Sequence, residues 1–198
     1  MKKVTSLTFA IYIALPCTAL SAPATIENTY DVFSFGTHLS SNRHQTFGLS
    51  GLNFDVSWVN SSEHIFRYKY MKSNADELPS ADSSVTQATL SYGVPFIYQR
   101  QPIVLFFGVA SKETVSHRCL NTCWDHETLD NGISLSVASS WDISPDLFVN
   151  VEGQVSNSVD SDVFIKFAYR VSPKIDTFVN LSAMNFQERL GAGLQIRF

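Results

Sequence analysis

The chain has 198 residues, of which 44% are hydrophobic and 16% are charged, and its formal net charge is −4. This acidic balance, with no basic groove in the pattern, argues against a nucleic-acid partner. No low-complexity or linker segment divides the sequence, so the about 175 residues that follow an N-terminal export signal are expected to form one domain.

Residues 1–24 have the features of a secretory signal peptide. Two lysines precede an apolar run at 7–15, and small residues follow it. The run is shorter than the roughly 20 residues that a membrane-spanning helix needs. We expect cleavage after Ser21 or after Ala24, leaving a mature domain of 25–198. Loss of the two lysines takes the net charge from −4 to −6.

Beyond the signal, apolar and polar residues alternate with a period of two, and Asn, Asp, Ser, Pro and Gly separate the alternating segments. This pattern predicts an all-β fold, a closed antiparallel up-and-down transmembrane β-barrel of ten strands. An eight-strand barrel is the alternative, because the alternation between Asp31 and Thr37 is poorly resolved. The predicted strands span 27–38, 45–59, 64–72, 85–98, 103–112, 132–141, 147–156, 162–171, 175–183 and 189–198.

The predicted connections are of two kinds that alternate along the chain. Short turns at one rim and long loops at the other are typical of outer-membrane barrels, whose periplasmic turns are short. With an even number of strands, both termini are expected at the periplasmic rim. The short turns are 60–63, 99–102, 142–145 and 172–174, and the longer connections are 39–44, 73–84, 113–131, 157–160 and 185–188.

Alternation by itself does not say which face of the strands points inward. A soluble lipocalin-like barrel would show the same period with its apolar face enclosed. However, each strand that runs toward the short-turn rim ends with an aromatic residue on its apolar face. Aromatic rings at one level are typical of a membrane interface, which favours the membrane barrel. This predicted interfacial girdle consists of Trp58, Tyr98, Trp141, Tyr169 and Phe198.

If the apolar face points to lipid, the charged face lines the lumen. Small barrels fill their interior with side chains, so we expect a plugged or very narrow lumen with ion pairs across it. The predicted lumen charges are Asp55, Arg67, Lys69, Glu152, Lys166, Arg170, Asp176 and Arg197.

The last strand, 190–198, carries apolar residues at even positions and ends on Phe198. With the export signal, the ladder of hairpins and the aromatic girdle, the chain resembles the small outer-membrane β-barrel proteins of Gram-negative bacteria, the group that includes the OmpA membrane domain, OmpX and Ail. The resemblance implies that the last strand is read by the barrel-assembly machinery. The best-known members of the group have eight strands, and the ten predicted here differ from them.

The predicted loop 113–131 contains Cys119 and Cys123. Because an exported protein meets oxidising conditions, we expect these residues to form a disulfide bond. A zinc site that adds His117 and His126 is the alternative, although the sequence lacks the paired spacing of such sites. The candidate loop contacts for a partner are His117, Trp124, Asp125 and His126.

Histidines concentrate in the predicted outer loops, which contain His38, His44, His117 and His126. Polar loops collect histidine without any function, but a loop cluster for metal binding or acid sensing is a second hypothesis.

The sequence indicates no cofactor and no catalytic residue set, since Asp125-His126 is a weak pair with no activated serine beside it. We expect a non-enzymatic barrel in the bacterial outer membrane whose outer loops, chiefly 113–131 and 73–84, contact a host or surface ligand. The alternatives are a narrow pore or small-solute channel and an enzyme with its site at the outer rim. The expected partners are membrane lipid, lipopolysaccharide and the barrel-assembly machinery.

Overall fold

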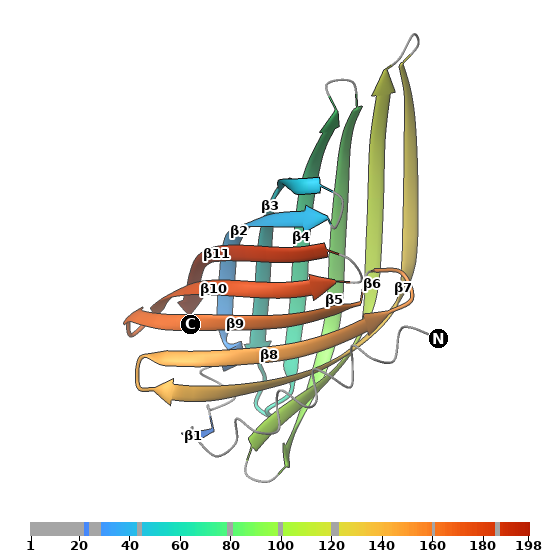
Figure 1. Ribbon diagram of the computed structural model, residues 1–198. Helices are drawn as coiled ribbons and strands as arrows, with labels where there is room; N and C mark the ends of the chain where they lie inside the picture. The colour runs from blue at the N-terminus through green and yellow to red at the C-terminus, as the bar shows by residue number, and fades with distance from the viewer. Residues whose placement is uncertain are drawn as a thin grey trace.

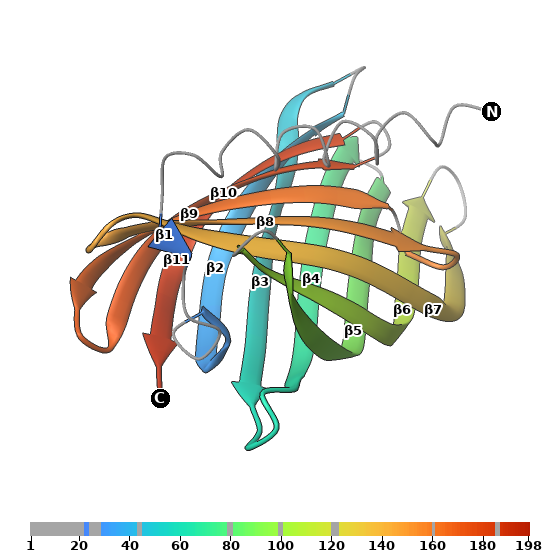
Figure 2. The ribbon, with the colours of Figure 1, turned by 90° about the horizontal axis from the view of Figure 1, so that it is seen from below.

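The computed structural model of the protein describes residues 22–23, 29–42, 45–78, 81–98, 101–119, 123–159, 161–184 and 187–198. These residues form one antiparallel sheet in which each long strand pairs with its neighbours in sequence. Strand β2 also pairs with β11, and β7 with β8, so the sheet closes into a barrel (Figures 1 and 2).

Ten long strands, β2 to β11, make the barrel wall, and β1 is a two-residue strand beside β7. The prediction of ten strands is confirmed, and the eight-strand alternative is wrong. No helix among the described residues is long and apolar enough to cross a membrane. The strands are β1 Ala22–Pro23, β2 Val32–Asn42, β3 Gln45–Val59, β4 Ile65–Leu78, β5 Ala81–Tyr98, β6 Gln101–Cys119, β7 Cys123–Ser144, β8 Leu147–Ser156, β9 Asp162–Ser172, β10 Ile175–Met184 and β11 Gln187–Arg197.

The strands on one side of the barrel are much longer than predicted. The segments 73–84 and 113–131, expected to be loops, are mostly strand, because β4 and β5 stay paired as far as Leu78 and Ala81, and β6 and β7 as far as Cys119 and Cys123. Figure 1 shows these two hairpins rising beyond the rest of the wall. On β7, every residue from 125 to 131 is exposed, so the polar composition of this segment is that of a strand in solvent and not of a loop.

The wall is apolar outside and polar inside. Along β11, Leu194 and Ile196 are exposed, whereas Gln195 and Arg197 between and beside them are buried. The same inversion runs through the other strands, since most of the large exposed side chains are apolar and many buried ones are polar. A soluble barrel would enclose its apolar face, so this arrangement excludes the lipocalin-like alternative and is that of a membrane barrel.

Two glycines face each other where β2 and β11 meet. Gly36 and Gly193 are register partners, and a Cβ atom on Gly193 would lie 2.1 Å from a backbone oxygen of β2 and 2.7 Å from the Phe178 ring. The absent side chains let Phe178 lie against this part of the wall. Inside the barrel, Phe178 packs with Phe148 and Ala168 in a small buried cluster.

The residue before β2 ties three strands together at the short-turn rim. The backbone N–H of Phe198 donates to the carbonyl oxygen of Asp31 over 3.1 Å, and the N–H of Val59 donates to its carboxylate over 2.6 Å. Val32 and Arg197 are register partners next to this contact. The first and last long strands of the barrel therefore meet side by side at one rim.

Candidate functional site

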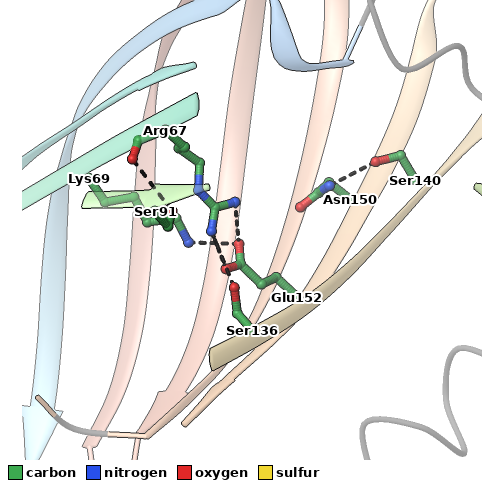
Figure 3. A network of polar contacts seen from close by, with 7 residues as sticks. All are labelled: Arg67, Lys69, Ser91, Ser136, Ser140, Asn150 and Glu152. Atoms are coloured by element: carbon green, nitrogen blue, oxygen red, sulfur yellow. Dashed lines mark hydrogen bonds and ion pairs between the residues drawn. The ribbon is translucent and has the colours of Figure 1, made fainter. Parts of the chain in front are cut away.

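An ion-pair network crosses the lumen between β4 and β8. The Arg67 guanidinium donates to both carboxylate oxygens of Glu152, over 3.0 and 2.6 Å, and the Lys69 ammonium reaches the same carboxylate at 2.6 Å. A further Arg67 N–H donates to Ser136 Oγ over 3.4 Å. Arg67 and Glu152 are both buried, and Figure 3 shows these side chains converging from opposite walls. The bidentate geometry is among the stronger forms of protein ion pair.

Apolar side chains fill the lumen on the short-turn side of this network. The Arg67 guanidinium lies over the Phe106 ring, 3.8 Å from its centre, and the Tyr30 ring lies 5.7 Å from that of Phe106. Both rings belong to a buried cluster with Ile65 and Val104, which lie near the starts of β4 and β6. Tyr30 precedes β2, and the sequence analysis did not assign it any role. The cluster and the ion pairs together occupy this end of the lumen.

A second ion pair joins neighbouring strands at the same end. The Arg197 guanidinium donates to both oxygens of Asp176, over 2.9 and 2.6 Å, and Gln195 Nε2 donates to the same carboxylate over 3.1 Å. Arg170 lies on β9, and its buried Nε has no hydrogen-bond partner among the described residues. Each of the eight charged residues expected in the lumen therefore takes part in an ion pair, has a buried polar atom, or lines the cavity described next.

The half of the lumen toward the long-hairpin rim contains a cavity of about 130 Å³. Its walls include Asp55 of β3, Lys69 of β4 and Lys166 of β9. Polar and aromatic side chains of these strands and of five others complete the lining, and the cavity ends beside the Arg67–Glu152 network that Lys69 joins.

The sequence had suggested that His38 lies in an outer loop. In the structure it lies in the wall of this cavity. It alternates in phase with Ser34 on β2, is buried, and its Nε2 lies 2.8 Å from Ser73 Oγ. His44 lies outside the described residues. No group of three His, Cys, Asp or Glu side chains that could hold a metal ion occurs in the part of the chain that the structure describes.

The second candidate region is the protruding sheet, which we define as 72–78, 81–88, 111–119 and 123–133 of β4 to β7. A strand of 22 residues such as β7 spans about 70 Å, whereas the 10 residues of β8 span about 33 Å. Pairing of β7 with β8 therefore stops at Ser134. Beyond it, the Ile133 N–H donates to Asn157 Oδ1 over 2.9 Å, and Ser156 Oγ donates to the Ile133 carbonyl over 2.9 Å.

These contacts show how the free edge of β7 is oriented. Because Ile133 turns its backbone N–H and C=O toward β8, every second residue beyond it turns its own groups to the same side. Asn131, Leu129 and Glu127 therefore present backbone donors and acceptors past the end of β8, while the residues between them pair with β6. All residues from 125 to 131 are exposed. We call 125–131 the open edge.

The predicted loop contacts lie at the far end of this sheet. Asp125 and His126 are exposed residues of β7. Cys119 and Cys123 are register partners at the end of the β6–β7 hairpin. The side chains of both cysteines, and of His117 and Trp124, lie outside the described part of the structure, so the disulfide and the zinc alternative remain predictions.

Four of the five predicted girdle residues expose their rings on the outer wall. Trp58, Tyr98, Tyr169 and Phe198 are 44%, 51%, 54% and 71% exposed. Trp141 differs, because only 4% of it is exposed. It lies where β7 continues past its pairing with β6 and pairs with β1 instead, an arrangement that side-chain alternation does not reveal.

Comparisons with known proteins agree with the fold. No protein-family model and no curated protein sequence matches the chain. Among solved structures, the β domain of the Bordetella autotransporter BrkA covers 84% of this chain and 98% of its own, with 7% identity and a TM-score of 0.52. The translocator domain of the autotransporter NalP from Neisseria meningitidis covers 98% of each chain, with 8% identity and a TM-score of 0.50.

A KdgM porin solved in complex with disordered oligogalacturonate covers 84% of this chain and 99% of its own, with 13% identity and a TM-score of 0.45. At identities this low, the likenesses bear on the fold alone. Taken with the closed antiparallel wall and its apolar outer face, the likenesses to the two autotransporter domains show that the chain has the fold of a transmembrane β-barrel.

Proposed function

We propose that this protein is a non-enzymatic outer-membrane barrel whose protruding sheet binds a partner at the cell surface. The open edge of β7 is the observation that carries the proposal. It offers backbone donors and acceptors at alternate residues, and it lies beyond the part of the wall that β8 covers. Natural proteins usually protect such edges, so a long exposed edge on a surface protein is a binding feature.

The mode of binding that fits this edge is strand addition. An extended segment of the partner would pair with the backbone of Asn131, Leu129 and Glu127, as in other β-augmentation complexes. Glu127 and Asp130 make the edge acidic, which favours a segment rich in Lys or Arg. A second copy of this chain, paired edge to edge, would bring these carboxylates together, and like charges across paired strands are destabilising.

Proline substitution tests the edge directly. Leu129→Pro removes a backbone donor that points away from β6, so the hairpin ladder keeps its own hydrogen bonds. Leu129→Ala is the matched control for loss of the side chain. We expect the proline variant to abolish adhesion of bacteria that display the protein, and the alanine variant to retain it. Equal adhesion by both variants would contradict strand addition.

Replacing 113–131 by a short turn is the broader test of the protruding sheet. Adhesion should be lost while the barrel still assembles, which the heat-dependent gel shift of barrels in detergent would report. Unchanged adhesion would contradict the proposal. In the same cells, external protease should cut the protruding sheet and spare the short turns, as expected if both ends of the barrel wall lie at the periplasmic rim.

A narrow pore is the second candidate, and the lumen cavity of about 130 Å³ is what favours it. The Arg67–Glu152 pair and the apolar cluster around Phe106 favour a closed lumen. Planar-bilayer recording separates the two functions. A closed barrel should show no steady conductance, whereas a pore should show single-channel steps in the unmodified protein.

A further inference from the structure

The walls of the lumen cavity carry charged groups of both signs, and two of them, Lys166 and Asp55, form no ion pair within 4.0 Å among the described residues. We propose that this cavity binds a small zwitterion, a molecule with one amine and one carboxylate, as in an amino acid. The inference goes beyond surface binding, because it concerns the inside of the barrel and none of the residues of the open edge.

Lys166 supplies the positive side. Its ammonium lies 4.8 Å from the centre of the Phe178 ring. In the described part of the chain it forms no ion pair within 4.0 Å, and the lumen carboxylates Glu152 and Asp176 are bound to other cations. An ammonium held in a cavity wall beside an aromatic face, without an ion pair of its own, has donors left for an anionic group.

Asp55 supplies the negative side. Its register partner on the next strand is Lys69, but the Lys69 ammonium is bound to Glu152 instead. Asp55 Oδ1 is therefore buried without a hydrogen-bond partner among the described residues, and so is one oxygen of Asp162 in the same cavity. Buried acceptors without partners are costly, and an amine would satisfy them.

Other buried atoms in the wall also lack partners. The amide oxygen of Asn53 and the Nδ1 of His38 have none among the described residues, although the Nε2 of His38 is bound to Ser73. Both line the cavity. The site therefore provides unsatisfied acceptors as well as unsatisfied donors, on side chains that the barrel wall holds in place.

The charges of the wall select the class of ligand. A simple anion would meet the cations of the wall, Lys69, Lys166 and Arg189, but also the oxygens of Asp55, Asp162 and Asn53. A simple cation would meet those oxygens but also Lys166. A zwitterion satisfies both sets at once. A volume of about 130 Å³ holds on the order of ten water-sized atoms, which is enough for a small amino acid.

Binding is tested on the full mature barrel, refolded in a nonionic detergent so that no zwitterionic headgroup competes. Glycine, acetate, methylammonium and glycerol are titrated separately, and backbone amide shifts of β3 and β9 are followed by NMR. We expect glycine to cause saturable shifts around Asp55 and Lys166. Acetate and methylammonium should each bind at least tenfold more weakly, and glycerol should cause no saturable shift.

Two variants and two matched controls assign the site. Lys166→Met and Asp55→Asn should each weaken glycine binding at least tenfold. Lys174→Met and Asp146→Asn remove the same charges at exposed short turns and should leave glycine binding unchanged.

The inference is overturned if glycine causes no saturable shift in the folded barrel, which would mean that the cavity holds only water. It is also overturned if acetate or glycerol binds as tightly as glycine. Should a lumen variant fail to fold, the comparison of the four probes on the unmodified protein still decides.

Discussion

The lumen network and the open edge contain the same kinds of residue in opposite settings. Glu152 is buried and bound to Arg67 and Lys69, whereas Glu127 is exposed on a strand that has a neighbour on one side. In the lumen network, charges are matched within the chain and hold opposite walls together. On the open edge, every second residue has backbone groups that β8 does not pair. The difference separates the part that defines the shape of the molecule from the part available to another molecule.

Removing the carboxylate of the lumen network should have the largest effect on stability. Glu152→Gln leaves the buried Arg67 and the half-buried Lys69 without their counter-ion, and breaking a buried pair in this way costs about 3–5 kcal/mol. Urea unfolding of the barrel in lipid vesicles measures the change. The double variant Glu152→Gln and Arg67→Met should recover part of the loss, because it removes one of the unpaired cations. If Glu152→Gln lowers the free energy of unfolding by less than about 1 kcal/mol, the network does not hold the walls together.

A methyl group at the glycine pair should have an intermediate effect. Gly193→Ala places a Cβ atom 2.1 Å from a backbone oxygen and 2.7 Å from the Phe178 ring, so the wall has to shift. Overpacking of this kind costs about 1–3 kcal/mol. The same unfolding measurement reports it. Adding Phe178→Leu to Gly193→Ala should recover part of the lost stability. If it recovers none, the contact with the backbone oxygen alone causes the loss.

Neutralising the exposed carboxylate should have the smallest effect on stability. Glu127→Gln is the same substitution as Glu152→Gln at a different place in the fold. We expect it to change the free energy of unfolding by about 0.5 kcal/mol or less. Surface adhesion should nevertheless weaken if a basic segment binds the open edge. A loss of stability comparable to that of Glu152→Gln would erase the distinction between the two regions.

The number of strands was predictable from sequence because lipid on one side and a polar lumen on the other impose a strict period of two. The upper end of β7 was not, because a strand exposed to water on both faces loses that contrast and its sequence resembles that of a loop. His38 was assigned to a loop for a related reason. A polar residue near the end of a predicted strand fits a polar lumen as well as it fits an outer loop.

The composition of the lumen was predictable, but its pairing was not. Strand parity placed Arg67 and Glu152 on the inner face, yet they are 85 positions apart, and their contact depends on how the closed wall brings β4 opposite β8. Tyr30 was placed in the predicted strand 27–38, whose alternation is poorly resolved, whereas in the structure it precedes β2 and its burial in the lumen was not predicted. Trp141 is buried and pairs with β1, a strand of two residues that periodicity does not detect.

The seam between β2 and β11 has a consequence for how the chain could be rewired. Val32 and Arg197 pair like residues at any other junction of the wall, and the hydrogen bonds of Asp31 lie beside them. A short peptide linking these two positions, with a new opening at the exposed Pro145–Asp146 turn, would give a circularly permuted barrel with the same wall. The order of the strands along the chain is thus separable from their order around the barrel.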